Sequence, residues 1–248
     1  MARPVKLCTV TRLSRTEFVN QSWLGCSMRH FPQGKLPQIR LFVENTGSAL
    51  LGLPQGYNIA LSECDDNDIL LLVHDDVYIH EWLLVDRLQE ALTRFDVVGV
   101  AGSQQPDLRQ PSWFLMFDDH LNPRGPQVDM RPSGVVAHGN HTNPEVSFYG
   151  ESPAECQLLD GLLLALDVGK VRAAGLRFDE RFQFHCYDID FTRRARAAGL
   201  RVGTWPIAVT HASAGNFDSP QFRLAARAYL NKWQKPDAEA ALSTPHGP

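Results

Sequence analysis

Apolar runs rich in Val, Leu and Ile recur along the chain, and helical patterns separate them. This alternation predicts an α/β fold built on a mostly parallel central sheet flanked by helices. The predicted strands cover residues 5–11, 39–45, 68–76, 97–103, 162–168 and 201–209. The predicted helices cover residues 16–29, 56–64, 80–94, 168–174, 189–198 and 220–233.

One long segment, residues 104–158, departs from the alternation and is rich in Pro, Asn, Gly and Asp. A stretch of this length inside a compact domain is either disordered or a functional insertion. It contains the aromatic residues Trp113, Phe114, Phe117 and Phe148. We therefore expect a folded or ligand-ordered region, and we expect the tail at residues 236–248 to be mobile.

The composition excludes several classes of protein but does not identify a particular one. A formal net charge of −4 gives no support for broad binding to nucleic acid. Five cysteines, an odd number without a CxxC pair, argue against a disulfide scaffold or a thiolate zinc site. No secretory signal core and no apolar run of about 18 residues is found, so we expect a cytoplasmic protein without a transmembrane segment.

Three polar residues follow the apolar strand "DILLLV" directly: His74, Asp75 and Asp76. Side chains alternate along a strand, so His74 and Asp76 point to one face and Asp75 to the other. Ligands of open α/β sheets bind beyond the carboxyl ends of the strands, and carboxylates there suit Mg²⁺ or Mn²⁺. The competing interpretation is a strand end with a capping acid. His211, which closes "TWPIAVTH", is either a nitrogen ligand or a structural histidine.

A second acidic pair, Asp188 and Asp190, lies in the aromatic stretch "RFQFHCYDIDF". Both fall in the first turn of the helix predicted here, where the helix dipole favours acids. Two positions apart on a helix, their side chains point roughly 200° apart. We therefore expect one acid to face a cleft and the other to cap the helix or to pair with Arg193 or Arg194.

The order of these features resembles a known family. Asp160-Gly161, Phe178-Asp179, the "YDID" box, Ala198-Gly199 and His211 follow one another as in the C-terminal half of family 2-type glycosyltransferases with a GT-A fold. The subgroup most similar is the one related to the streptomycin-biosynthesis glycosyltransferase-like domain. "VHDD" resembles the acidic metal motif of these enzymes, and "LFVENTGSALLGLPQGYNIAL" their second strand and following helix. The resemblance covers roughly residues 5–215 and is weak between 104 and 158.

The resemblance implies a role for each acid. Asp76 would be the main ligand of Mn²⁺ or Mg²⁺, and His211 a further ligand. Asp75 would lie next to the ribose or the diphosphate of the donor. Asp188 would be the general base that takes a proton from the acceptor hydroxyl, and in-line attack would invert the anomeric centre.

The resemblance also implies positions that bind the nucleotide sugar. The matching residues near the nucleotide are Thr9, Thr11, Arg12, Glu44, Asn45 and Asn58. Glu44 stands where many relatives carry Asp. Asp160 and Gly161 would border the pocket of the donor sugar. Each of these two assignments has a structural alternative that stays open. Asn58 is then a buried residue of a helix, and Asp160-Gly161 is then only a turn.

The sequence thus predicts a single GT-A-like domain over residues 1–235, with 104–158 as a loop-rich insertion on the acceptor side. Its predicted activity is metal-dependent, inverting transfer of a hexose from a nucleotide-diphosphate sugar, with UDP favoured. The predicted acceptor is a hydroxyl of a glycan, a lipid-linked molecule or a small molecule, as in polysaccharide biosynthesis. Peripheral membrane contact and the oligomeric state stay open. The alternatives are a catalytically inactive glycan-binding or scaffold domain, and a metal-dependent phosphohydrolase built on His74, Asp75, Asp76 and His211.

Overall fold

The computed structural model describes residues 2–32, 36–47, 50–213, 215 and 217–234, which form two mixed β-sheets, a two-stranded sheet and seven helices. The larger sheet contains β1 (Val5–Val10), β2 (Gln38–Phe42), β3 (Ile69–Val73), β5 (Val97–Gly99), β11 (Ala154–Glu155), β13 (Leu163–Asp167) and β14 (Val202–Thr204). The second sheet contains β4 (Val77–Ile79), β6 (Ala101–Ser103), β9 (Pro132–His138), β10 (Glu145–Gly150), β12 (Leu158–Leu159) and β15 (Val209–His211). A separate two-stranded sheet contains β7 (Leu115–Phe117) and β8 (Pro123–Pro126).

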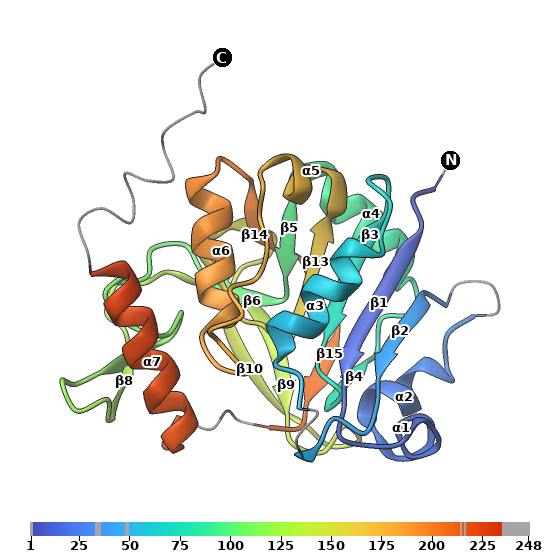
Figure 1. Cartoon of the computed structure of the whole chain (residues 1–248), viewed down its shortest axis with the longest axis horizontal. Coiled ribbons are helices and arrows are strands. Elements are labelled where there is room, and N and C mark those ends of the chain that lie inside the picture. The colour runs from blue at the N-terminus through green and yellow to red at the C-terminus, as the bar shows by residue number, and fades with distance from the viewer. Residues whose placement is uncertain (1, 33–35, 48–49, 214, 216, 235–248) are drawn as a thin grey trace.

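The helices follow the predicted pattern with shifted ends. They are α1 (Arg15–Gln21), α2 (Trp23–Met28), α3 (Leu53–Ser62), α4 (Leu84–Arg94), α5 (Val168–Ala173), α6 (Tyr187–Ala197) and α7 (Pro220–Trp233). Figure 1 shows α3 and α6 in front of the larger sheet and α4 behind it. The helix predicted over 16–29 is two helices, because the Ser22 side chain accepts a hydrogen bond from the Gly25 N–H and so starts α2.

The α/β class is confirmed, but the central sheet is mixed rather than mostly parallel. Its order is β11-β14-β5-β13-β3-β1-β2, and β13 runs antiparallel to both of its neighbours. The chain enters β13 directly from β12 through the turn at Asp160-Gly161, without a crossover helix. β12 belongs to the second sheet, so β13 is not entered by the crossover that joins parallel neighbours of one sheet.

Two predicted strands are each divided between the two sheets. The run 97–103 breaks at Val100 into β5 and β6, and the run 201–209 into β14 and the start of β15. The segment 104–158 is folded, as expected: it forms β7 to β11 and supplies β9 and β10 to the second sheet. The tail predicted to be mobile, 236–248, lies outside the described residues. Among those that are described, no helix has the length and apolarity to cross a membrane.

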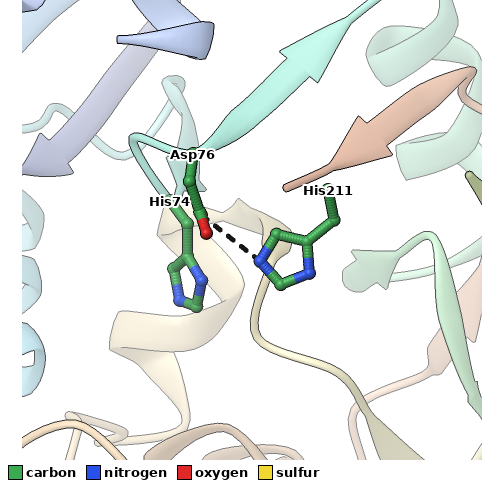
Figure 2. A group of neighbouring side chains, drawn as sticks. All are labelled: His74, Asp76 and His211. Carbon is green, nitrogen blue, oxygen red and sulfur yellow. Dashed lines mark ion pairs between the residues drawn. The ribbon is translucent and has the colours of Figure 1, made fainter. Parts of the chain in front are cut away.

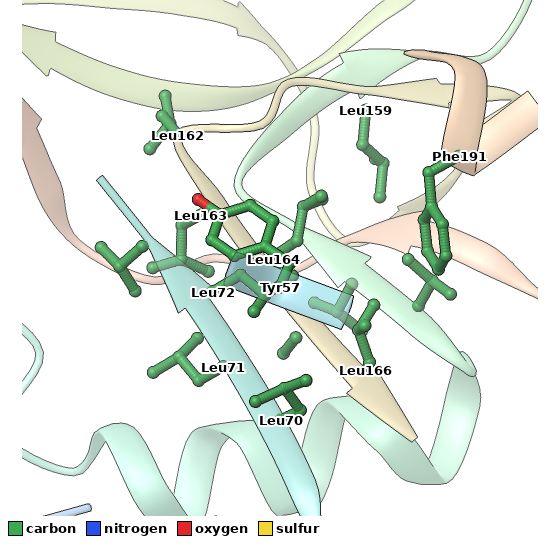
Figure 3. Packing of buried hydrophobic residues seen from close by; sticks show 14 of the residues in the cluster. Tyr57, Leu70, Leu71, Leu72, Leu159, Leu162, Leu163, Leu164, Leu166 and Phe191 are labelled. Atoms are coloured by element: carbon green, nitrogen blue, oxygen red, sulfur yellow. The ribbon is translucent and has the colours of Figure 1, made fainter. Parts of the chain in front are cut away.

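The core is built around the leucine runs of β3 and β13, which are adjacent strands (Figure 3). Leu71, Leu72, Leu163 and Leu164 are all fully buried, and Tyr57 of α3 belongs to the same core cluster. Continuous apolar runs are typical of strands covered on both faces. Each fully buried leucine contributes about 1.5–3 kcal/mol through removal of apolar surface from water. The end of β3, where His74, Asp75 and Asp76 follow, is therefore fixed on a rigid strand.

A buried acid, Asp96, ties β5 to α5 and to the strand β14. Its carboxylate lies 2.6 Å from Lys170 Nζ and 3.0 Å from an Arg201 guanidinium nitrogen, and it also accepts the Arg201 backbone N–H. Burial alone would raise the pKa of Asp96, but these hydrogen bonds outweigh burial and lower it to about 2. Asp96 is therefore a stabilising carboxylate at neutral pH.

Replacing Asp96 by asparagine is expected to lower the free energy of unfolding by about 2 kcal/mol at pH 7, because two cations lose their partner. The folded-state pKa is depressed, so this contribution is complete above about pH 4 and is lost as the pH falls towards 2. Urea unfolding at pH 7, 4 and 3 measures the difference between the two proteins. Asp119→Asn, at an exposed position, is the control. An undiminished difference at pH 3 would contradict the assignment.

Candidate functional site

A cavity of about 690 Å³ opens where the two sheets meet, beyond the ends of β3 and β15. It is lined by parts of β9 and β10, the segment 111–115 and the first turn of α6. Its lining includes the acid–base or metal-binding side chains of His74, Asp76, Asp160, Asp188 and His211, and also those of His138, Glu145 and His185. The cavity therefore brings together His74 and His211, which are 137 positions apart in the sequence.

Three of these residues form a candidate metal site. His74, Asp76 and His211 each offer one ligand atom, and these atoms all lie within 4.8 Å of one another (Figure 2). The strand predicted over 68–76 ends at Val73, and His74 and Asp76 lie in the turn that joins β3 to β4, with both side chains at the cavity. His211 joins them because β15 pairs with β4 in a register that sets His211 opposite Val77. Two imidazole nitrogens and one carboxylate are a donor set that suits Mn²⁺ and related divalent transition metals.

Asp76 and His211 interact directly, and each stabilises the charged form of the other. His211 Nε2 lies 3.3 Å from Asp76 Oδ1. Burial opposes ionisation of both groups, but the hydrogen bond and the opposite charge outweigh it. The pKa of Asp76 is thereby lowered to about 2, and the pKa of His211 is raised above its ordinary value. An ionised carboxylate is therefore present at neutral pH to bind a cation.

The buried hydroxyl of Tyr187 sets the orientation of His74. It lies 2.7 Å from His74 Nε2 and 3.0 Å from the carbonyl oxygen of Gly161. A carbonyl can only accept, so Tyr187 donates to Gly161 and its oxygen accepts a proton-bearing Nε2 of His74. Nδ1 of His74 then keeps its lone pair. This is the arrangement by which a second group prepares a histidine to bind a metal.

Replacing Tyr187 by phenylalanine is expected to weaken Mn²⁺ binding about tenfold, because His74 loses the group that fixes its tautomer and ring orientation. Isothermal titration with MnCl₂ measures the dissociation constant. Tyr229→Phe removes another buried tyrosine hydroxyl, in α7, and is the matched control. Equal Mn²⁺ affinity in both variants would show that Tyr187 only supports packing.

Asp188 faces the cavity from the first turn of α6. Cys186 precedes the helix in a left-handed conformation (φ 62°) and turns the chain into it. The Asp188 carboxylate accepts the Gly161 N–H at 2.9 Å. Burial, aided by the charge of Asp160, raises the pKa of Asp188 to about 7. A carboxylate with a pKa near neutrality is suited to general base catalysis.

Asp160 and Gly161 form the turn that lies against Asp188. The Trp113 indole N–H donates to Asp160 at 2.8 Å, and the Leu162 N–H donates to it at 2.9 Å. Gly161 has no room for a side chain, since a Cβ would lie 2.3 Å from the Tyr187 hydroxyl oxygen. The Asp-Gly pair is thus more than a turn: it positions both Asp188 and Tyr187.

Asp190 has the structural role expected of one acid in the pair, but with different main partners. It is fully buried, 2.6 Å from Lys232 Nζ, and it accepts the Trp233 indole N–H at 2.9 Å. Of the two partners predicted from sequence, Arg194 is 3.9 Å away, while the Arg193 guanidinium lies over the Trp233 ring. Asp190 therefore anchors α7 to α6.

The residues at the ends of β1 and β2 lie together on the other side of the β3 end. Thr11 Oγ1 donates to Asp75 at 2.5 Å, which confirms that Asp75 and Asp76 point to different sides. Burial raises the pKa of Asp75 above its ordinary value. Thr9 is completely buried, and Arg12 is exposed. Contact of these four residues with a nucleotide stays a prediction.

Glu44 and Asn45 join this region through the backbone, because their N–H groups donate to the carbonyl oxygens of Leu13 and Thr11. Glu44 is exposed and has a left-handed backbone (φ 52°). The Asn45 side chain is used within its own loop, where it bonds to the backbone of Leu51.

Asn58 is buried in α3, and its amide makes three hydrogen bonds that tie the helix to the stretch 178–180. The structural interpretation of Asn58 accounts for all of these contacts. Contact of Glu44, Asn45 or Asn58 with a nucleotide stays a prediction.

Comparison with known proteins identifies the fold. No protein-family model matches the chain, and no curated protein matches it. The solved structure of GalNAc-T7 with UDP, GalNAc and Mn²⁺ is 12% identical, with a TM-score of 0.51, and covers 100% of this chain and 52% of GalNAc-T7. The chain has a GT-A-like fold. At this identity the likeness establishes the fold alone.

Two further structures are similar over most of the chain. TarS 1-349 of S. aureus in complex with UDP is 14% identical with a TM-score of 0.48, over 96% of this chain and 69% of TarS 1-349. The catalytic domain of Drosophila beta1,4galactosyltransferase 7 in complex with xylobiose is 12% identical with a TM-score of 0.40, over 81% of this chain and 64% of that domain.

Three residues of this site have contacts that the sequence did not predict: His74, Tyr187 and Trp113. His74 is predicted to share a face with Asp76, but the resemblance gives it no metal-binding role, and only the phosphohydrolase alternative uses it. Tyr187 lies in the quoted "YDID" box but has no role there. Nothing in the sequence links Trp113 to Asp160. Long-range contacts such as these leave no local pattern.

Proposed function

We propose that the protein is a divalent-metal-dependent glycosyltransferase that uses a nucleotide-diphosphate sugar, with a UDP-sugar favoured, and inverts the anomeric centre. The observation that supports this most strongly is one cavity that holds both a three-residue metal cluster and Asp188 with a pKa near 7. A transferase needs these two functions side by side, one for the leaving diphosphate and one for the acceptor hydroxyl.

In this proposal His74, Asp76 and His211 hold the metal. The bound metal supplies positive charge that stabilises the departing nucleoside diphosphate. Tyr187 keeps His74 in the tautomer that leaves Nδ1 unprotonated. The two imidazoles favour Mn²⁺ over Mg²⁺, since Mg²⁺ prefers an all-oxygen shell. Asp75, with Thr11 beside it, would lie next to the ribose or the diphosphate.

Asp188 acts at the acceptor. Its carboxylate takes the proton of the attacking hydroxyl while the acceptor oxygen bonds to the anomeric carbon and the bond from that carbon to the diphosphate oxygen breaks. The Gly161 N–H donates to one carboxylate oxygen and so fixes the orientation of the carboxylate. Attack from the side opposite the leaving group inverts the configuration. The aromatic side chains around the cavity limit access of competing water.

The direct test is binding and slow hydrolysis of nucleotide sugars. With Mn²⁺ present, at least one UDP-sugar is expected to raise the unfolding temperature and to be hydrolysed without acceptor. EDTA should remove both effects. Absence of any nucleotide-sugar binding, together with Mn²⁺-dependent phosphate release from p-nitrophenyl phosphate, would instead identify a phosphohydrolase.

We also propose that the protein acts in a reducing compartment such as the cytoplasm. Its five cysteines are all free, and four of them are buried. Burial raises the pKa of the Cys8 and Cys156 thiols well above their ordinary value, so these groups are unreactive hydrophobic side chains.

A further inference from the structure

The described lining of the cavity has acids and histidines but no permanently charged cation. Four carboxylates face it, and none of its described lining residues is a lysine or an arginine. These carboxylates belong to Asp76, Asp160, Asp188 and Glu145. Asp76 belongs to the metal cluster, and the other three acids remain in the cavity, with Asp188 only partly ionised at neutral pH because its pKa is about 7. Phosphate and carboxylate groups are bound in proteins by arginine, lysine or clustered N–H donors, and the described lining has no such cations.

Three aromatic rings form one wall of the same cavity. Trp113, Phe114 and Tyr149 pack around one another with ring centroids 5.1–5.2 Å apart. Trp113 is also bonded to Asp160, so this wall is fixed directly beside the acids. Aromatic walls with a few polar groups are typical of sites for ring-shaped small molecules. A sugar-like ring offers apolar C–H faces to such a wall and hydroxyls to the carboxylates.

The strand β10 presents two different faces, and only one meets the cavity. Glu145, Ser147 and Tyr149 line it, while Val146 and Phe148 point away and are 62% and 70% exposed. This alternation is that of a strand with period two. Glu145 is thus the exposed first residue of the row of β10 side chains that line the cavity. Of the four acids that line the cavity, Glu145 is the one outside both the metal cluster and the Asp160–Asp188 pair.

We propose that the acceptor is a hydroxylated ring that carries an amine, such as an amino sugar or an aminocyclitol, and that acceptors bearing phosphate or carboxylate on this ring are excluded. The proposal rests on the proposed function, because it assigns the acceptor of that site. The ring lies against the wall of Trp113, Phe114 and Tyr149, and its ammonium group pairs with Glu145. Its hydroxyl then reaches Asp188.

Three matched probes test the charge preference: methyl β-glucoside, the methyl glycoside of glucosamine and the methyl glycoside of glucuronic acid. Saturation-transfer NMR titrations give their dissociation constants. We expect the amine to bind at least about threefold more tightly than the neutral ring, as for a partly exposed ion pair. The carboxylate should bind at least about tenfold more weakly than the neutral ring, because it meets like charges.

Replacement of Glu145 by glutamine should remove the advantage of the amine and leave binding of the neutral ring unchanged. The matched control is Glu151→Gln, at an exposed acid just after β10 that does not line the cavity. A further variant, Tyr149→Ala, should weaken the amine and the neutral ring by the same factor. The proposal is overturned if the carboxylate binds as well as the amine, if no probe binds, or if Glu145→Gln leaves the amine preference intact.

The titrations are run with and without UDP and Mn²⁺, so that the two proposals fail in different ways. Absence of UDP and Mn²⁺ binding would contradict the proposed function while the ring preference is still measured on the apoprotein. Binding of UDP and Mn²⁺ together with a preference for the anionic ring would contradict only the acceptor assignment.

Discussion

Replacing Asp188 by asparagine is expected to reduce sugar transfer about 1,000-fold while leaving binding of Mn²⁺ and UDP unchanged. Asparagine keeps the oxygen that accepts the Gly161 N–H, so the loop geometry is preserved, but the side chain can no longer take a proton. Loss of a general base typically costs roughly 100- to 10,000-fold in rate. The measurement is the release of UDP in the presence of acceptor, combined with titration of UDP and Mn²⁺ into both proteins.

The same substitution is expected to stabilise the metal-free protein. The pKa of Asp188 is raised from an ordinary value of 3.8 to about 7, so the folded state holds a proton that the unfolded state releases. Wild-type stability is therefore lost as the pH rises from about 4 to 7, while the asparagine variant is spared this loss. Urea unfolding at pH 4, 6 and 8, without metal, measures the growing difference in the free energy of unfolding between the two proteins.

Asp190→Asn is the matched control, two residues away on the same helix turn. It should lower stability by about 2 kcal/mol, because Lys232 loses its buried, negatively charged partner. The Asp188→Asn and Asp190→Asn substitutions are thus expected to change the free energy of unfolding in opposite directions. If Asp188→Asn were also destabilising at pH 8 and retained full transfer, Asp188 would be a structural acid and the assignment of the base would be wrong.

Replacing Asp76 by alanine is expected to weaken Mn²⁺ binding at least about 100-fold and to abolish metal-dependent nucleotide binding. Asp76 is the one carboxylate in the cluster with His74 and His211, and it also orients His211 through their 3.3 Å contact. Loss of a group that only orients a metal ligand already costs roughly 10- to 100-fold. Isothermal titration with MnCl₂, followed by UDP, measures both effects.

The adjacent acid supplies the control for this prediction. Asp75 is held by Thr11 on the other side of the strand and is no member of the cluster. Asp75→Asn should therefore change the affinity for Mn²⁺ alone by less than about threefold, while it weakens UDP in the presence of Mn²⁺. If both variants lost Mn²⁺ equally, the metal would be bound by the Asp75-Asp76 pair and His211 would have another role.

Local patterns in the sequence are sufficient for the elements and for part of the site. Apolar runs predict β1, β3 and β13 to within a few residues, and the helix over 220–233 matches α7. Helix geometry separates Asp188 from Asp190, because the helix period of about 3.6 is a property of the local backbone. Asp75 and Asp76 point to different sides as predicted, but they lie in a turn after β3 rather than in the predicted strand.

The tertiary structure alone decided what depends on strand order and on contacts between distant residues. The antiparallel placement of β13, the division of the run 97–103 between two sheets and the pairing of β15 with β4 are set by packing of the whole chain. That pairing brings His211 to Asp76, and the turn at Gly161 joins Tyr187 and Asp188. The sequence therefore determined which side chains leave each element and on which face, whereas their convergence on one cavity required the fold, because residues far apart in the chain meet only when the sheets pack.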